Sequence, residues 1–185
     1  MGESAWRSLV TVGNVQKGQR VLIHGGDGGV GSSAVQVGKA LGAYVIATAS
    51  ARNHEFLRSL GADEIIDYTT TRFEDKVRNV DLVLNTANME TNLRSVGVVK
   101  RGGVLVSIVG PPPADACEKA GIRCAVIGRV NGELLSNLVE LANAGKYRIT
   151  IDRLMPLSDA AKAWEISREG HVRGKIVLQV SPGAT

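Results

Sequence analysis

Length, composition and charge limit the classes to which this protein can belong. With 185 residues, 44% of them hydrophobic and 22% charged, the chain is expected to form a globular domain rather than a disordered or collagen-like one. Lysine and arginine exceed aspartate and glutamate by 22 − 18 = +4, a mild positive charge that suits an anionic small ligand. Aromatic residues, on which the bases of a nucleic acid would stack, make up only 4% of the chain, and this low content argues against nucleic-acid binding. Without a long apolar run or an apolar signal core, and with two cysteines only, we expect a cytoplasmic protein with no membrane partner.

Apolar runs alternate with helical patterns along the chain. Short continuous apolar runs predict strands buried on both faces, and apolar residues three and four positions apart predict helices. Strands are predicted at 19–24, 43–48, 64–66, 80–85, 104–109, 123–127 and 175–180, and helices at 32–41, 53–60, 89–99, 132–144 and 160–166. This order predicts one α/β domain over residues 1–185, a Rossmann-type doubly wound parallel sheet with helices on both faces.

A glycine-rich turn joins the first predicted strand to its helix. Residues 25–31 read GGDGGVG, with glycines three apart at 25, 28 and 31. A dinucleotide pyrophosphate needs a tight turn, a backbone that it can approach closely, and the free N–H groups of a helix N-terminus. The turn lacks the Gly-Lys-Ser/Thr ending of a P-loop, so we expect it to bind a dinucleotide instead.

The end of the second predicted strand bears on the choice of dinucleotide. NAD-binding folds usually carry Asp or Glu there, which binds the ribose 2′-hydroxyl. Residues 47–53 read ATASARN and contain no carboxylate, which also counts against a methyltransferase that uses S-adenosylmethionine. The planar guanidinium of Arg52 suits a 2′-phosphate, so NADP(H) is the predicted cofactor. The alternative is that Arg52 is a solvated residue at the start of a helix.

Four segments occur in an order that resembles a known family. They are VLIHGGDGGVGSSAVQVGKALGAYVIATAS at 21–50, LGADEIIDY at 60–68, VKRGGVLVSIVG at 99–110 and GHVRGKIVLQV at 170–180. Together they resemble the medium-chain dehydrogenase/reductase superfamily, in its zinc-independent, NADPH-dependent quinone oxidoreductase-like branch. Members begin with a GroES-like catalytic domain, which we expect to be absent here apart from strand 175–180, which returns to it in the family.

The resemblance implies an activity for the intact protein. It would be an NADPH-dependent oxidoreductase that passes hydride to a quinone or another conjugated carbonyl, and the protein would position the nicotinamide. The substrate cleft would lie between two domains, so no catalytic side chain is named and the chain alone is expected to be almost inactive. Two alternatives stay open, an enoyl reductase segment of a polyketide synthase and a non-catalytic NADP(H)-binding module.

The resemblance also implies a set of cofactor-binding residues. The glycine turn would hold the pyrophosphate, the end of the second strand would contact the 2′-phosphate, and the ends of the fourth and fifth strands would flank the nicotinamide. A tyrosine would pack near the adenosine phosphate, unless it is an ordinary strand-end residue. The implied residues are Gly25, Gly28, Gly29, Val30, Gly31, Ser50, Arg52, Asn53, Tyr68, Asn85, Thr86, Val109 and Gly110.

The remaining expectations concern metal, histidine, tryptophan and assembly. Segment 3–6 lacks the zinc-ligand cysteine of the superfamily's alcohol dehydrogenases, and Cys117 and Cys124 lack the C-x2-4-C spacing, so no metal is expected and both should be ordinary thiols. His24 is interpreted as a packed, hydrogen-bonded core residue, and Trp164 as a packing residue. An apolar edge strand at 122–127 favours a homodimer.

Overall fold

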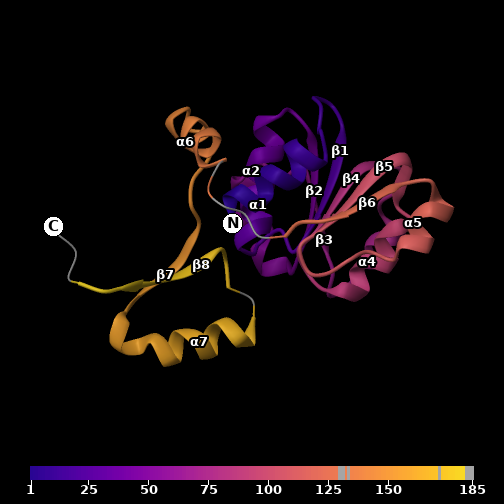
Figure 1. The fold of residues 1–185 in the computed structure, drawn as a ribbon. Coiled ribbons are helices and arrows are strands. Elements are labelled where there is room, and N and C mark those ends of the chain that lie inside the picture. The colour runs from indigo at the N-terminus through magenta and orange to yellow at the C-terminus, as the bar shows by residue number, and fades with distance from the viewer. Residues whose placement is uncertain (129–131, 133, 171, 182–185) are drawn as a thin grey trace.

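A parallel six-stranded sheet forms the centre of the computed structural model, which describes residues 1–128, 132, 134–170 and 172–181. The strand order is β3-β2-β1-β4-β5-β6, so the direction of winding reverses between β1 and β4 (Figure 1). The strands are β1 (Arg20–His24), β2 (Tyr44–Ala49), β3 (Glu64–Asp67), β4 (Val80–Asn85), β5 (Val99–Ser107) and β6 (Arg123–Val126). The predicted doubly wound α/β fold is confirmed.

The continuous apolar runs explain why the central strands are buried on both faces. Val21, Leu22 and Ile23 of β1 are all 0% exposed. Val21 and Ile23 belong to the hydrophobic core on one face of the sheet, and Leu22 belongs to the core on the other face. Successive side chains of a strand point to opposite faces, so an apolar run rather than an alternating pattern is what such a strand requires.

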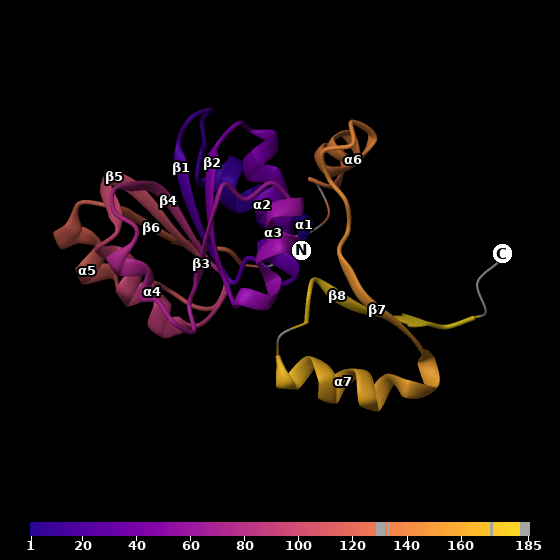
Figure 2. The ribbon, with the colours of Figure 1, turned by 180° about the vertical axis from the view of Figure 1, so that it is seen from behind.

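Helices cover both faces of this sheet. α1 (Gly2–Trp6) continues as a π-helical segment, Arg7–Val12, and packs with α2 and α3 against one face, while α4 and α5 cover the other (Figures 1 and 2). The bounds are α2 (Gly29–Ala40), α3 (His54–Ser59), α4 (Met89–Val96), α5 (Ala114–Ala120) and α6 (Leu135–Asn143), with 3-10 turns at Ala51–Asn53 and Phe73–Asp75. No helix in the described ranges is long and apolar enough to cross a bilayer.

Several element boundaries differ from the prediction. The predicted helix 89–99 ends at Val96, because β5 begins at Val99 and pairs with β4 across an irregularity in register. Helix α5 and strand β7 (Ile151–Pro156) were not predicted. The predicted helix 132–144 includes residue 133, which lies outside the described residues.

The C-terminal segment forms a small parallel unit beside the main sheet. β7 pairs with β8 (Lys175–Gln179), and α7 (Ala160–Glu169), preceded by the 3-10 turn Leu157–Asp159, connects the two strands (Figure 2). The unit contacts the glycine-rich turn through a bridge between Gly28 and Gly174. Trp164 on α7 is 68% exposed, so its interpretation as a packing residue is wrong within the described residues.

The two cysteines form a disulfide, which corrects the expectation of ordinary thiols. Cys117 lies on α5 and Cys124 on β6, and their Cα atoms are 6.2 Å apart. Gly121 ends α5 in the left-handed conformation, with φ of 66°, and turns the chain back toward the strand. This reversal brings two residues seven positions apart within the distance that a disulfide spans.

Candidate functional site

A cavity of about 570 Å³ lies at the carboxyl ends of the parallel strands, beside the point where the strand order reverses. Doubly wound sheets bind their ligands at this place. The cavity is lined on one side by the glycine-rich turn and on the other by residues that follow β3 and β4 and by α4. Six residues implied by the resemblance line it: Gly25, Gly28, Gly29, Val30, Tyr68 and Thr86.

The glycine-rich turn is held tightly against the start of α2. Gly25 has φ of +67°, a conformation that favours glycine, and its carbonyl oxygen accepts a hydrogen bond from the Gly28 N–H at 3.1 Å. A Cβ atom added at Gly31 would lie 2.0 Å from the Gly25 oxygen, so Gly31 is required where the helix meets the turn. None of the described side chains caps the N-terminus of α2, which leaves its first N–H groups to face a ligand.

The segment before β8 packs on this turn and on the end of β2. The Gly174 N–H donates to the Asp27 carbonyl at 2.9 Å. Arg173 donates through Nε to Asn53 Oδ1 at 2.6 Å and through a terminal nitrogen to the Arg52 carbonyl at 3.0 Å. The Asn53 amide in turn donates to the Asp27 carboxylate. Asn53 is only 1% exposed, so its side chain is occupied by internal partners rather than turned toward the cavity.

The other residues expected near the 2′-phosphate differ in their surroundings. Arg52 is exposed on the 3-10 turn that follows β2. The Ser50 hydroxyl at the end of β2 is buried and has no hydrogen-bond partner within the part of the chain that the structure describes. A buried hydroxyl without a partner costs free energy that a polar ligand group can recover.

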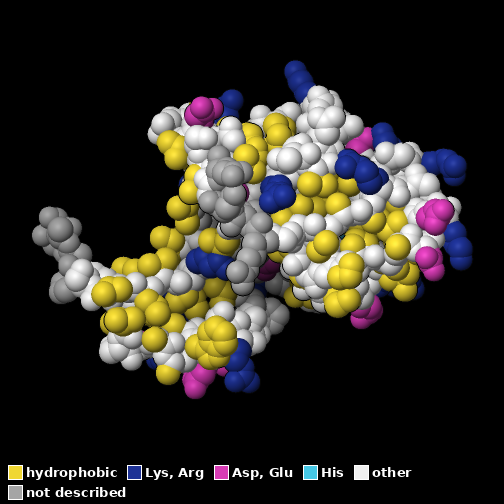
Figure 3. Space-filling view, in the orientation of Figure 1, with side chains coloured by type: hydrophobic (Ala, Val, Ile, Leu, Met, Phe, Trp, Pro, Cys, Tyr) yellow, Lys and Arg dark blue, Asp and Glu magenta, His cyan; other side chains and the backbone are white. Residues whose placement is uncertain are grey.

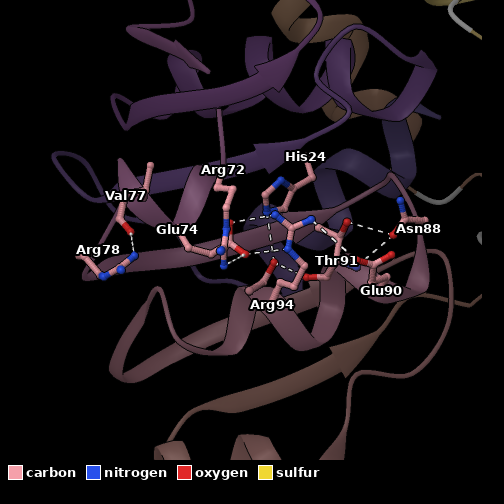
Figure 4. Close-up of polar contacts among 10 residues, drawn as sticks. His24, Arg72, Glu74, Val77, Arg78, Asn88, Glu90, Thr91 and Arg94 are labelled. Carbon is pink, nitrogen blue, oxygen red and sulfur yellow. Dashed lines mark hydrogen bonds and ion pairs between the residues drawn. The ribbon is translucent and has the colours of Figure 1, made fainter. Parts of the chain in front are cut away.

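An aromatic ring, Phe73, and an arginine, Arg94, also line the cavity. Figure 4 shows Arg94 between Glu74 and Thr91. The Arg94 guanidinium lies over the Phe73 ring, 4.9 Å from its centroid, and donates to both Glu74 carboxylate oxygens at 2.6 and 2.9 Å. The hydrogen bond from Arg94 lowers the pKa of the Glu74 carboxyl. The ion pair with Glu74 therefore holds the Arg94 guanidinium in one orientation beside the cavity.

His24 forms the floor of the cavity at the end of β1. It is 2% exposed, and its ring packs edge-on against Phe73 with the centroids 4.4 Å apart. Burial and the nearby Arg94 lower the pKa of His24 to about 3, against a smaller opposing effect of Glu74. The interpretation of His24 as a hydrogen-bonded core residue is confirmed, because the ring is neutral at physiological pH and its two nitrogens lie 3.3 and 3.1 Å from hydroxyl oxygens.

Of the residues at the ends of β4 and β5 that the resemblance implies beside the nicotinamide, only some line the cavity. Thr86 lines it and donates to the His24 carbonyl at 2.7 Å. Asn85 is 0% exposed, and its amide donates at 2.7 Å to both the Asn88 carbonyl and Asn92 Oδ1. Asn88 caps α4, and its side chain accepts from the Thr91 N–H. Val109 and Gly110 follow β5 but are not among the residues that line the cavity.

The sequence reasoning missed several cavity residues that arrive from other elements. Arg94 and Thr91 come from α4, Phe73 from the 3-10 turn before β4, and Lys175 from the start of β8. Lys175 lies in a segment that carries the family resemblance, so a sequence signal for it existed. Arg94 and Phe73 have no such signal, because their place beside the cavity depends on the packing of α4.

The residues of this site fit a nicotinamide dinucleotide better than a metal ion. Gly28 and Gly29 line the cavity at the N-terminus of α2, and the side chains of Arg94 and Lys175 line it as well. The buried Ser50 hydroxyl at the end of β2 is outside that lining and has no hydrogen-bond partner among the described residues. Within the described residues, no group of three or more His, Cys, Asp or Glu side chains is placed to hold a metal.

Comparison with known proteins agrees with this geometry. The family model described as zinc-binding dehydrogenase matches residues 60–178, and the model of the C-terminal domain of alanine dehydrogenase/PNT matches residues 3–104. The chain is 32% identical to the mouse protein NAD(P)H oxidoreductase RTN4IP1, mitochondrial, over 96% of the chain and 53% of the relative. It is 34% identical to the chloroplastic quinone-oxidoreductase QR1 of Triphysaria versicolor, over 87% of the chain and 52% of the relative.

Solved structures similar to this chain show the same fold and how much of each protein the chain covers. The quinone oxidoreductase from Coxiella burnetii superposes with a TM-score of 0.89 and 37% identity, over 97% of this chain and 58% of that one. The CurK enoyl reductase gives a TM-score of 0.87 and 28% identity, over 97% and 60%. The chain thus spans about half the length of the curated relatives it matches. It belongs to the zinc-binding dehydrogenase family of the medium-chain dehydrogenase/reductase superfamily, and within that superfamily it is similar to quinone oxidoreductases.

Proposed function

We propose that this chain is the cofactor-binding part of an NADPH-dependent oxidoreductase that reduces quinones or other conjugated carbonyls by hydride transfer. The observation that carries the proposal is the glycine turn at the mouth of the cavity, where the Gly25 carbonyl excludes any side chain at Gly31. A backbone this close to a helix N-terminus is the arrangement that binds a pyrophosphate. The names of the similar proteins, which include quinone oxidoreductases, support the substrate class.

The proposed preference for NADP(H) over NAD(H) rests on the end of β2. Residues 47–53 contain no carboxylate of their own, while Ser50 and Arg52 supply a hydroxyl and a positive charge. The Asp27 carboxylate lies against this segment, where it accepts from the Asn53 amide. Asn53 would act indirectly, since its side chain holds Arg173 and Asp27. Arg52 and Arg173 bring positive charge to this segment, which favours a bound phosphate on electrostatic grounds.

The residues of this chain would hold and orient the cofactor. When bound, the nicotinamide supplies the hydride. The glycine turn and the N-terminus of α2 would bind the pyrophosphate, Lys175 would add charge beside it, and Thr86 would border the ring at the end of β4. The tight network that fixes Asn85 and Asn88 keeps this part of the wall in one position.

We propose that the rest of the protein covers the apolar side chains that this chain leaves exposed. They gather on β7, β8 and α7 (Figure 3), where Ile151, Leu154 and Trp164 are 54%, 60% and 68% exposed. An apolar patch of this kind marks an interaction surface. The substrate cleft would form against that missing part, so the 185-residue chain is expected to bind cofactor but to reduce almost no quinone. The mitochondrial and chloroplastic relatives leave the cytoplasmic location as a prediction.

The similarity to an enoyl reductase supports a second candidate function. The CurK enoyl reductase shares the fold at 28% identity, so a conjugated acyl chain on a carrier is an alternative substrate. Both reactions deliver hydride to an electron-poor carbon from the same cofactor. Turnover by the full-length protein with quinones, simple enones and carrier-bound enoyl chains separates the two.

Substitution of Arg52 tests the cofactor assignment. Hydrogen bonds to charged groups are worth about 1.5–3 kcal/mol, and each 1.4 kcal/mol is tenfold in affinity. Arg52→Ala should therefore weaken NADPH binding by about 10- to 100-fold and leave NADH binding almost unchanged, as measured by titration of both nucleotides.

Arg58→Ala is the matched control for this experiment. Arg58 is an exposed arginine on α3 that borders a different surface groove. It should leave the affinity for both nucleotides unchanged. Equal loss of NADH and NADPH affinity in Arg52→Ala would show that the arginine is structural, and a wild-type preference for NADH would refute the reasoning from the missing carboxylate.

A further inference from the structure

A buried imidazole connects the two walls of the cavity. His24 Nδ1 lies 3.3 Å from the Thr48 hydroxyl oxygen on β2, and Nε2 lies 3.1 Å from the Ser95 hydroxyl oxygen on α4. All three side chains are buried, at 2%, 3% and 0% exposure. Figure 4 shows the ring of His24 beside the Arg94 guanidinium, at the point where β1 approaches α4. The His24 ring therefore connects strand β2 with helix α4, through one hydroxyl on each element.

The hydrogen-bond partners determine which ring nitrogen carries the proton. The Ser95 hydroxyl donates its single proton to the Thr91 carbonyl at 2.6 Å, so its oxygen can only accept from His24. His24 must then donate through Nε2–H, and the neutral ring leaves Nδ1 as an acceptor for the Thr48 hydroxyl. The Thr48 oxygen accepts in turn from the Gly25 N–H at 3.2 Å. Every donor and acceptor is satisfied in this single arrangement.

The other protonation states of the ring leave groups unsatisfied. With the proton on Nδ1, Thr48 would have two donors and no acceptor for its own proton, and Nε2 would compete with the Thr91 carbonyl for the proton of Ser95. A doubly protonated ring would place a buried charge near Arg94, and burial together with Arg94 opposes it, in line with the lowered pKa of His24. The neutral Nε2–H form is the state that fits the structure.

We propose that His24 is a positioning residue: its Nε2–H tautomer completes a directed chain from the Gly25 N–H through Thr48, His24 and Ser95 to the Thr91 carbonyl. Gly25 and Thr91 both line the cavity, on its opposite walls. The chain thereby sets the position of the glycine turn relative to α4 and, through it, the affinity for the cofactor. The part of this inference that concerns affinity rests on the proposed function, whereas the chain itself does not.

The tautomer is measured first, without any cofactor. Nitrogen-15 NMR of histidine-labelled protein should show His24 protonated at Nε2 and unprotonated at Nδ1, without titration between pH 5 and pH 8. A proton on Nδ1, or a titration near the ordinary pKa of histidine, would overturn the proposal.

Transmission along the chain is measured next, on the amide resonance of Gly25. Ser95→Ala removes the acceptor of His24 Nε2–H and should shift the Gly25 amide, although the two residues are separated by His24 and Thr48. The same substitution in a His24→Leu background should leave Gly25 unchanged. Ser107→Ala, which removes another fully buried, hydrogen-bonded serine, is the control and should not move Gly25. A Gly25 amide that does not respond to Ser95→Ala overturns the proposal.

Cofactor binding supplies the last readout. Thr48→Val and Ser95→Ala should each weaken NADPH binding by about 3- to 10-fold in protein that remains folded, because each removes a hydroxyl that makes two hydrogen bonds of the chain. The double variant should bind NADPH with the same affinity as the single variant that binds it less tightly, since both changes interrupt the same chain. Effects that multiply, or that persist in the His24→Leu background, contradict the positioning role. If wild-type protein binds no NADPH, the proposed function fails, and the two NMR experiments still decide whether the chain exists.

Discussion

Gly31→Ala tests whether the glycine turn is packed as the structure describes. The added Cβ would lie 2.0 Å from the Gly25 oxygen and 2.8 Å from the Gly25 carbonyl carbon and the Gly26 Cα, all of them backbone atoms. Overpacking a tight site costs about 1–3 kcal/mol, and an overlap with backbone calls for the upper value. Alanine recovers about 1 kcal/mol through its higher helix propensity. The expected net loss is about 2 kcal/mol in the free energy of unfolding.

Gly28→Ala is the matched control in the same turn. Its added Cβ would meet only the Gly25 oxygen at 3.4 Å, an ordinary contact, and Gly28 has φ of −73°, which any residue adopts. Urea denaturation should show no significant loss for Gly28→Ala, and thermal unfolding of Gly31→Ala should occur about 4–8 °C lower than that of wild type. Because Gly28 lines the cavity, Gly28→Ala should weaken NADPH binding despite its normal stability. A Gly31→Ala variant as stable as wild type would refute the described packing of the turn.

Three further predictions concern the disulfide, acid stability and assembly. Reduction, or Cys117→Ser with Cys124→Ser, should lower the free energy of unfolding by about 2 kcal/mol, since the bridge closes a short loop, and two free thiols in the native protein would contradict the bridge. Between pH 6.5 and 3 the unfolded chain binds a proton on His24 that the native state excludes. Acidification should therefore lower the free energy of unfolding by up to about 1.4 kcal/mol per pH unit through this residue. A His24→Gln variant whose free energy of unfolding falls equally steeply with pH would refute this. β6 lies at the sheet edge with Val126 51% exposed, so sedimentation should show a homodimer, and a monomer at high concentration would exclude it.

The central fold could be predicted because its strands are buried on both faces. β1 contains the unbroken apolar run 21–23 and β4 the unbroken apolar run 82–84, and neither run suggests another structure. β7 could not be predicted in this way, because its residues Ile151–Pro156 mix charged and apolar side chains and end in proline. Its main contacts are with β8, which is distant in the sequence.

Trp164 and the cysteines show where pattern alone is insufficient. The apolar spacing around Trp164 predicts a packed face, but none of the described residues covers this side chain, which is 68% exposed. The pairing of Cys117 with Cys124 depends on the reversal of the chain at Gly121, which spacing rules for metal sites do not address.

The candidate site could be predicted as far as the backbone determines it. The glycine turn follows from glycine spacing between a strand and a helix. By contrast, Asn53 and Asn85 were expected at the ligand by position, and the structure shows both side chains bonded to internal partners. Arg94 reaches the cavity only through the packing of α4 on Phe73, a tertiary contact that no local pattern encodes.

One measurement tests the central claim most directly: NADPH titrated into nitrogen-15-labelled protein of this length, with every backbone amide followed. The account predicts saturable shifts concentrated at residues 25–31, 50–53 and 86–88 and at Lys175, around the cavity at the carboxyl ends of the strands. NADH should give the same pattern except at 50–53, with weaker affinity. The absence of saturable shifts, or shifts centred on the groove between α2 and α3 that Arg58 and Arg148 border, would contradict the account.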